Sequence, residues 1–174
     1  MCTKKKNLRS AEIQFFSYAT KGVPKPKYGE QSVLDIMYEK AEAEGRLDEI
    51  KFARNDENDS PLHIACELGH KDVVEWILNK LEPDVNQPNH SGASPLFLVC
   101  VKGYMGAEGV ASKLDRVKEH RLDIVEMLFN KGADISFTEI NKMTPLHWAA
   151  FNEDDKLVKY FLEKGAKQIS SDAG

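Results

Sequence analysis

Apolar and polar positions form helix-sized blocks along most of this chain. One block has apolar residues at helical spacing: Leu62, Ile64, Ala65 and Leu68. A second block follows directly, with Val73, Val74, Ile77 and Leu78. Between them stands Gly69, a residue type that commonly ends helices because it adopts the left-handed conformation without penalty. The pattern predicts two short helices that bury one face each.

The first helix opens with a four-residue motif that occurs three times. The three copies are Ser60-Pro61-Leu62-His63, Ser94-Pro95-Leu96-Phe97 and Thr144-Pro145-Leu146-His147. Proline suits the first helical position, where its missing N–H is no loss, and the preceding Ser or Thr can cap the helix. The prolines stand 34 and 50 residues apart, so a unit of 33 residues gains one residue and then an insertion of 17.

The second helix of each unit also has a recurring form. It contains Asp72-Val73-Val74-Glu75, Asp123-Ile124-Val125-Glu126 and Lys156-Leu157-Val158-Lys159. A repeat length of 33 residues with these motifs resembles the ankyrin repeat, and the resemblance covers roughly residues 33–169. It implies an all-α ankyrin repeat solenoid of about four repeats, a right-handed curved stack of helix pairs with short β-hairpin fingers. It also implies that His63 and His147 hold the turn together by hydrogen bonds.

The chain divides into three parts on this interpretation. Residues 1–31 form a basic N-terminal arm and helix with a Pro/Lys linker, residues 32–169 form the repeat domain, and residues 170–174 form a tail. The repeats fall at about 32–55, 56–88, 89–138 with an insertion at 104–120, and 139–169. In the arm we expect a helix from Ser10 to Thr20, with Ile13 and Phe16 facing inward and Gly22 as its end.

Two features depart from the repeated pattern. The insertion continues an apolar stripe, formed by Leu114, Val117, Ile124, Val125 and Leu128. It predicts a helix over 113–130, about two turns longer than usual, after a mobile glycine-rich loop. The turn glycine that precedes the opening motif is kept as Gly92 but is replaced by Asn58 and Lys142. Lys adopts positive φ poorly, so we expect a distorted finger before the last repeat.

The last repeat poses a packing problem. Residues 170–174 are small and polar and do not predict a capping helix, so Val158, Phe161 and Leu162 are expected at an open end. Three explanations remain: another segment covers this end, the chain comes from a longer protein, or a partner docks there. The first two are favoured, because exposed apolar patches are uncommon unless they are used.

Composition fits a soluble single domain. The 174 residues are 41% hydrophobic and 30% charged, and the longest apolar run, Leu96–Val101, is too short to span a bilayer. No apolar segment of a secretory signal follows the basic start. The cysteine count is odd, and Cys66 and Cys100 occupy equivalent repeat positions too far apart to be bridged. We therefore expect small core residues in a reducing compartment, the cytoplasm or the nucleus.

Charge is unevenly distributed. Residues 1–28 carry a net charge of +6, so the remainder carries −10. The basic arm has three interpretations: a disordered solubilising tail, a segment that folds onto the acidic repeats, or a contact with acidic lipid or nucleic acid. Any membrane contact is expected through this arm only, and we do not favour nucleic acid as a partner.

No constellation of residues predicts catalysis. The spacing Gly103-x-x-Gly106-x-x-Gly109 matches neither a dinucleotide fingerprint nor a phosphate loop, and no zinc spacing is present. Cys66 and Cys100 are expected to be buried without a basic neighbour, which is unsuitable for a nucleophile. We expect no enzyme activity, no catalytic residue, no cofactor, no metal and no small-molecule substrate.

The resemblance implies a protein–protein interaction module that acts as an adaptor, scaffold or inhibitor. Its partner surface comprises the finger tips and the inner faces of the first helices. Carried over to this sequence, the surface consists of Asp56, Glu57, Asp59, Glu67, Leu68, His90, Ser91, Val101, Lys102, Ile140, Asn141, Met143, Phe151 and Asn152. We expect a monomer that binds another protein.

Two alternatives to this function remain open. One is a regulatory or substrate-recruiting domain of a larger enzyme or channel. The other is a module tethered to acidic lipid or nucleic acid by the basic arm. For the partner surface itself, the sharper hypothesis is an apolar anchor near Phe151 with acidic steering at Asp56–Asp59. The competing interpretation is local packing of a finger distorted by Lys142.

Overall fold

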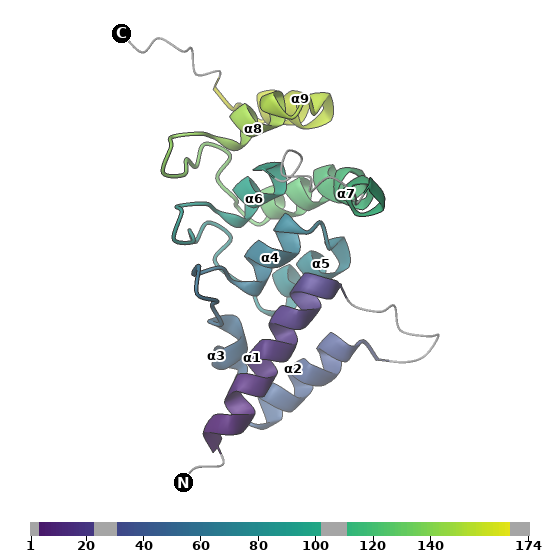
Figure 1. Ribbon diagram of the computed structural model, residues 1–174, viewed down its shortest axis with the longest axis vertical. Coiled ribbons are helices and arrows are strands. Elements are labelled where there is room, and N and C mark those ends of the chain that lie inside the picture. The colour runs from purple at the N-terminus through teal and green to yellow at the C-terminus, as the bar shows by residue number, and fades with distance from the viewer. Residues whose placement is uncertain (1–3, 23–30, 102–110, 168–174) are drawn as a thin grey trace.

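The helices of the protein form one elongated stack with the two chain ends at opposite poles (Figure 1). The computed structural model describes residues 4–22, 31–101 and 111–167. Within these ranges the secondary structure is helical, and no strand is formed. The predicted all-α architecture is therefore confirmed.

Three helix pairs make up the regular part of the stack. They are α4 (Pro61–Glu67) with α5 (Lys71–Lys80), α6 (Pro95–Val101) with α7 (Ala111–Asn130), and α8 (Pro145–Phe151) with α9 (Asp155–Glu163). The first helices contact one another in file, α4 on α6 and α6 on α8, while α5 packs on α7. We call α4, α6 and α8 the inner helices. Each apolar stripe is buried by the neighbouring pair, so order is gained only by stacking.

Histidine closes the start of two inner helices, as the resemblance implied. The Ser60 hydroxyl accepts from the His63 amide at 3.3 Å, and His63 Nδ1 accepts from the Ser60 amide at 3.1 Å. Thr144 and His147 repeat this reciprocal arrangement at 3.4 and 3.1 Å. In each case two amides that the helix itself leaves without partners are satisfied.

The first helix of the chain belongs to the stack rather than to a separate arm. Helix α1 (Lys4–Lys21) packs against α4 and against α3 (Leu47–Lys51). It ends, as predicted, before Gly22, whose φ is +75°. His70 Nε2, just past the end of α4, donates to the Thr20 carbonyl at 3.0 Å. The side chain of Asn152, just past α8, donates in the same way to the Cys100 carbonyl of α6 at 2.7 Å. Helix α1 thus occupies the same position relative to α4 as α6 occupies relative to α8, that of the preceding helix in the stack.

The residues that anchor α1 differ from those expected. Phe15 and Ala19, one helical turn apart, are each only 1% exposed, whereas Phe16 is half-buried. The side chain of Ile13 lies outside the described residues. Periodicity could not fix the rotation of this helix, because Phe15 and Phe16 are adjacent and only one of them can face α4.

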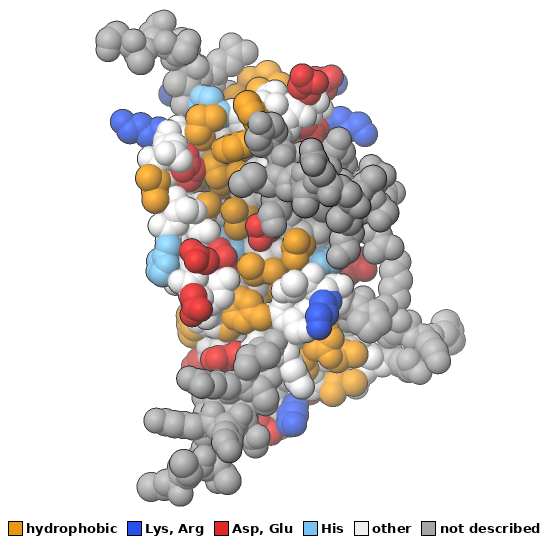
Figure 2. All heavy atoms as spheres, in the orientation of Figure 1, with side chains coloured by type: hydrophobic (Ala, Val, Ile, Leu, Met, Phe, Trp, Pro, Cys, Tyr) orange, Lys and Arg blue, Asp and Glu red, His pale blue; other side chains and the backbone are white. Residues whose placement is uncertain are grey.

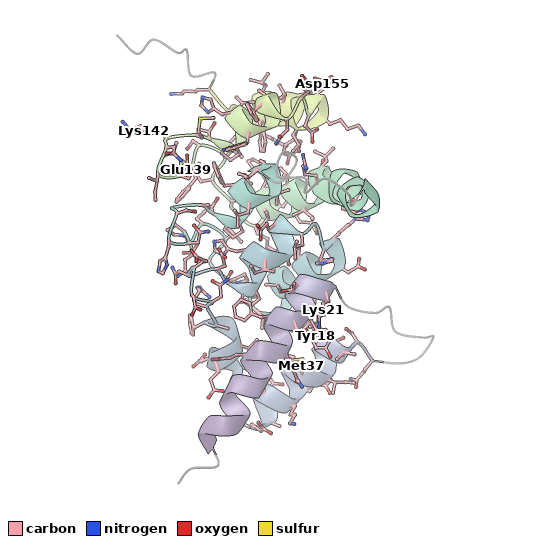
Figure 3. All side chains as sticks on the ribbon, in the orientation of Figure 1. Tyr18, Lys21, Met37, Glu139, Lys142 and Asp155 are labelled. Atoms are coloured by element: carbon pink, nitrogen blue, oxygen red, sulfur yellow. The ribbon has the colours of Figure 1, made fainter. Side chains whose placement is uncertain are left out.

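Helix α2 (Val33–Ala43) faces the outer helix α5 through Trp76. Trp76 Nε1 donates to Asp35 Oδ1 at 2.8 Å, and the ring packs edge-on to Tyr38 with centroids 6.0 Å apart. Phe15 of α1 meets the same indole at 5.8 Å. Trp76 therefore joins three helices as a partly buried aromatic packed against the core. In Figure 3, Tyr18 of α1 and Met37 of α2 lie in this part of the molecule.

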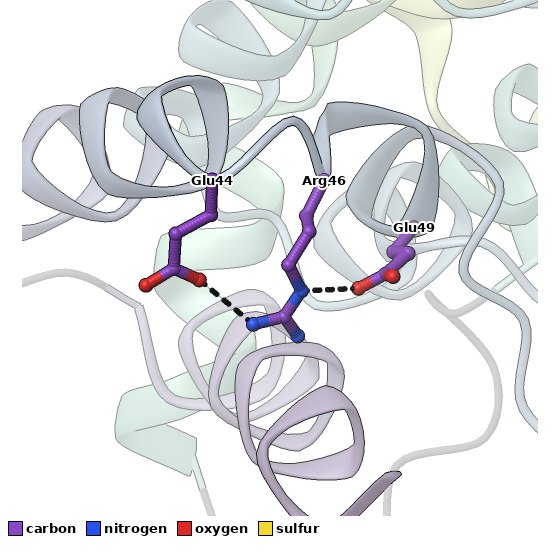
Figure 4. A network of polar contacts seen from close by, with 3 residues as sticks. All are labelled: Glu44, Arg46 and Glu49. Carbon is purple, nitrogen blue, oxygen red and sulfur yellow. Dashed lines mark hydrogen bonds and ion pairs between the residues drawn. The ribbon is translucent and has the colours of Figure 1, made fainter. Parts of the chain in front are cut away.

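A three-residue ionic network fixes the turn between α2 and α3 (Figure 4). Arg46 donates through Nε to Glu49 and through Nη1 to Glu44, each at 2.8 Å. The hydrogen bond to Glu49, followed by that to Glu44, raises the pKa of Arg46. The network orients the short α3, which leads into the first finger.

The long helix predicted over 113–130 is confirmed as α7. It has 20 residues, against 10 in α5 and 9 in α9. Ile124, Val125 and Leu128 are fully buried. The predicted mobile loop lies outside the described residues, as do the side chains of Leu114 and Val117. Arg121 of α7 is 3% exposed and donates to Asp154 Oδ2 at 3.2 Å, which joins the α6–α7 pair to the α8–α9 pair.

The last helix pair is less open than its sequence suggested. Phe161 was expected at an open end, but its exposure is 0%, because Leu157 and Phe161 lie one turn apart on the face of α9 turned to the stack. Val158 and Leu162 point away from that face. Val158 is half-buried and Leu162 is 39% exposed, so the prediction holds for these two residues only.

Candidate partner-binding face

Three fingers project from one side of the stack, each just before an inner helix (Figure 1). They are hydrogen-bonded turns, not the β-hairpins with strands that the sequence predicted. In the first finger the Asn55 amide donates to the Asp59 carbonyl at 3.1 Å, and the Asn55 side chain accepts from the Asp59 amide at 2.7 Å. Asn89 closes the second finger in the same way onto Ala93. Two backbone hydrogen bonds close each turn, which is too few for a strand ladder.

Successive fingers are bonded to each other. The His90 amide donates to the Glu57 carbonyl at 3.0 Å, and the Ile140 amide donates to the Ser91 carbonyl at 3.2 Å. Asn89 Nδ2 donates to Asp59 Oδ1 at 2.8 Å. The three fingers are therefore held as one continuous edge, and their spacing follows that of the inner helices.

The finger before the last repeat is not distorted, contrary to expectation. Lys142 takes φ +62°, the same value as Asn58 and close to the +76° of Gly92. Its amide closes the turn onto the Glu139 carbonyl at 2.9 Å, as Gly92 does onto Asn89 at 3.0 Å. Glu139 and Lys142 lie in this outermost finger in Figure 3. The turn geometry is imposed by the surrounding bonds, and the strain stays in the Lys142 backbone.

The inner helices present a partly exposed apolar stripe next to the fingers. Three equivalent positions are half-buried: Ile64, Leu98 and Trp148. One turn further along each helix stand Glu67, Val101 and Phe151. Phe151 is 56% exposed and packs edge-on to Trp148 with centroids 5.5 Å apart. Figure 2 shows hydrophobic side chains gathered over the inner helices, with acidic side chains and a histidine on the finger side.

The structure divides the predicted partner-binding residues into accessible and structural ones. On the fingers, six are exposed: Asp56, Glu57, His90, Ser91, Ile140 and Asn141. Four others are half-buried: Glu67, Leu68, Val101 and Met143. Lys102 lies outside the described residues.

Two of the predicted residues are parts of the scaffold. Asp59 is only 9% exposed, and its carboxylate accepts from the side chains of Asn55 and Asn89. Asn152 is engaged by the Cys100 carbonyl. These two were chosen by repeat position alone, and position does not reveal which polar groups are bonded internally. Sequence reasoning missed Ile64, Leu98 and Trp148, although their common place in the repeat was a usable signal.

Burial governs the chemistry of the interior groups. It raises the pKa of the Cys66 thiol and raises that of Cys100 to about 12. Cys100 does have a basic neighbour, Arg121, contrary to expectation, but desolvation outweighs its effect. Burial also lowers the pKa of His63, whose Nε2 donates to the Ala93 carbonyl at 3.2 Å. These groups are structural, and the described residues contain no cluster of three His, Cys, Asp or Glu suited to a metal ion.

Family models match nearly the whole stack. A model of ankyrin repeats in three copies matches residues 28–114, half of the chain, and another of ankyrin repeats in many copies matches residues 111–162. The chain belongs to the ankyrin repeat family. Ankyrin repeat domains are in general non-catalytic modules that bind other proteins. Among the described helices of this member, none has the length and apolar character needed to cross a membrane.

Several ankyrin repeat proteins are similar to this one. The ANK repeat-containing protein nipk-1 of Caenorhabditis elegans is 34% identical over 59% of this chain and 16% of its own length. The transient receptor potential cation channel subfamily A member 1 of Drosophila melanogaster is 26% identical over 80% of this chain and 11% of its own. The putative ankyrin repeat protein YahD of Escherichia coli is 30% identical over 59% of this chain and 45% of its own. The chain thus spans less than half the length of these relatives.

Proposed function

We propose that this ankyrin repeat chain is a non-catalytic adaptor, scaffold or inhibitor that binds a protein partner on the surface formed by its fingers and inner helices. The observation that carries the proposal is Phe151, a large aromatic side chain 56% exposed beside the half-buried Trp148. Large aromatic residues of this kind supply much of the affinity in protein interfaces. We also propose a cytoplasmic or nuclear location, which the free thiols of Cys66 and Cys100 support.

Ile140 adds a second apolar contact. It is 69% exposed at the tip of the last finger, held in place by the bond from its amide to Ser91. A partner that bridges the last finger and α8 would cover both Ile140 and Phe151. Side chains fixed on a bonded edge lose little conformational freedom on binding, which favours affinity.

Exposed acidic side chains lie at the first-finger end of this surface. Asp56 and Glu57 are exposed on the first finger, whereas Asp59 is engaged internally and contributes to the scaffold. The partner is therefore proposed to place an apolar side chain against Phe151 and basic groups near Asp56 and Glu57. Such exposed charges act mainly on the association rate.

The test begins by capturing partners with the chain. Each captured partner is then purified, and its affinity for the chain is measured by surface plasmon resonance. Phe151→Ala should weaken binding at least about tenfold, which corresponds to about 1.4 kcal/mol. Its matched control is Ile36→Ala, because Ile36 is 50% exposed on α2, away from the inner helices. Equal effects of the two substitutions would refute the proposed anchor.

A second pair of variants tests steering. Reversing Asp56 and Glu57 to Lys should slow association and flatten its dependence on salt, with little effect on dissociation. Asp155→Lys, an exposed acid on α9 (Figure 3), is the control. An unchanged association rate in the finger variant would remove steering from the proposal.

A second candidate function follows from the span of the relatives. Because this chain spans less than half the length of the relatives described above, a regulatory or substrate-recruiting domain of a larger enzyme or channel is also proposed. The binding surface would be the same, and the partner would be either another part of that protein or its substrate. Tethering by the basic arm stays a third proposal, on residues 1–28.

A further inference from the structure

The outer end of the last helix pair has the surface of an interior repeat. We define the end face by five residues, Leu146, His147, Ala150, Val158 and Leu162. Nine of their ten counterparts in the two preceding repeats are buried, and the tenth, Phe129, is half-buried. Cys66 and Cys100, the counterparts of Ala150, are 0% exposed, as are Val74 and Val125, the counterparts of Val158. In the last repeat Ala150 is exposed and Val158 half-buried.

The end face keeps its apolar character despite this exposure. The last repeat of a stack ordinarily carries a polar outer face, because that face meets water. Here the five positions hold four aliphatic residues and one histidine, while the charged residues of α9 stand elsewhere on the helix, at Asp155, Lys156, Lys159 and Glu163. The face is therefore built to be covered.

Two polar groups at this end of the stack are the counterparts of groups that make hydrogen bonds inside the stack. His63 Nε2 donates to the Ala93 carbonyl of the next finger at 3.2 Å. His147 has the same cap, with Nδ1 accepting from the Thr144 amide, which leaves the proton on Nε2. Among the described residues, His147 Nε2 has no hydrogen-bond partner.

The tip of the last finger also has a polar group whose counterparts are hydrogen-bonded inside the stack. The carbonyls of Glu57 and Ser91 each accept from the amide of the following finger, at 3.0 and 3.2 Å. The equivalent group in the last finger is the Asn141 carbonyl, and within the described part of the chain it accepts no hydrogen bond. The end face thus offers one donor and one acceptor at the positions where a following repeat supplies a carbonyl and an amide.

We propose that the end face binds an ankyrin-type helix pair with its finger, carried by another protein. This occupant fits because its finger amide meets Asn141, the carbonyl before its first helix meets His147, and its helices cover Leu146, Ala150, Val158 and Leu162. A second copy of this chain fits less well, because its stack begins with α1 and α2, and no described finger precedes them. The end face shares only the Asn141 carbonyl with the surface of the proposed function, whose contacts are Phe151, Ile140, Asp56 and Glu57, so either can fail alone.

The experiment supplies the occupant in cis and uses the full chain. A copy of residues 135–167 is inserted after Lys167, which keeps the 33-residue spacing and gives the junction Gly132-Ala133-Asp134-Ile135 with Lys167 in the place of Asp134. Thermal unfolding should shift upward by about 5 °C or more, because the copy covers the apolar end face. In NMR spectra the Nε2 proton of His147 should become protected from exchange. No shift in unfolding and no protection would overturn the proposal.

Two matched variants separate the end face from a general effect of added length. Ala150→Asp with Leu162→Asp should abolish the gain of the extended chain, because both changes place charge in the new interface. Lys156→Asp with Lys159→Asp adds the same acids to exposed positions of α9 and should leave the gain intact. An equal gain in all three extended chains would contradict the proposal.

Sedimentation of the original chain tests whether a second copy is the occupant. A monomer at micromolar concentration excludes a second copy, as the proposal requires. A dimer that dissociates in the Ala150→Asp variant would show that copies of this chain cover one another, and it would overturn the proposal.

Discussion

Replacing Lys142 by Gly should stabilise the protein. Lys142 closes its finger at φ +62°, a conformation that costs an ordinary residue about 1–2 kcal/mol and glycine almost nothing. Its side chain is exposed, and within the described residues it makes no hydrogen bond or ion pair, so the substitution removes no contact.

The gain is reduced by the greater freedom of glycine in the unfolded chain, which costs about 0.5–1 kcal/mol. The net stabilisation is therefore about 0.5–1 kcal/mol, which raises the melting temperature by roughly 1–4 °C in a chain of this size. Lys142→Asn should lie between Lys and Gly, because Asn58 holds the same φ of +62° in the first finger.

Urea unfolding followed by circular dichroism measures the difference, and the reverse change provides the control. Gly92→Lys should destabilise by a similar amount, because Gly92 has φ +76° while an added Cβ would lie no closer than 3.4 Å to its neighbours. A neutral or destabilising Lys142→Gly, with Gly92→Lys also neutral, would show that the last finger relaxes freely and that no strain is stored there.

Three further predictions concern interior groups. Burial lowers the pKa of His63, which lies beside Asp59 and Arg54. The neutral His63 therefore contributes fully to the free energy of unfolding above pH 6.5, and this contribution declines as the pH falls below 6.5, by at most about 1.4 kcal/mol per pH unit. His63→Gln should flatten this pH dependence in urea titrations from pH 5 to 8. Asp59→Ala should cost about 1–3 kcal/mol in urea unfolding because Asn89 loses its partner, whereas the exposed Asp56→Ala should stay within about 0.5 kcal/mol. In a Cys2→Ser background, Cys66 and Cys100 should react with a thiol reagent at pH 8 only as fast as the protein unfolds, since their pKa values are raised; rapid labelling would disprove their burial.

The repeated helix pairs were predictable because their signals are local. Pro61, Pro95 and Pro145 mark the helix starts, the capping side chains stand within three residues, and the long α7 follows from an apolar stripe of constant period. Each of these depends on residues that are close in sequence and therefore on propensities that act before any long-range contact forms.

What could not be predicted depends on contacts between repeats. The burial of Asp59 is set by Asn89, 30 residues away, and the neighbour of Cys100 is an arginine on another helix. Likewise, the undistorted finger at Lys142 depends on the bond from Ile140 to Ser91, since the neighbouring finger imposes its geometry. Repeat position indicated which residues lie on the fingers and the inner helices, but it did not show which of them are occupied by internal hydrogen bonds.

The placement of α1 matters for anyone who trims this protein for the laboratory. The family match begins at residue 28, and a fragment cut there would lose Phe15 and Ala19 together with the acceptor of His70. The indole of Trp76 and the adjoining side of α4 would then meet water, and the shortened chain would be expected to aggregate. A fragment intended for crystals or binding assays should therefore start no later than Lys4.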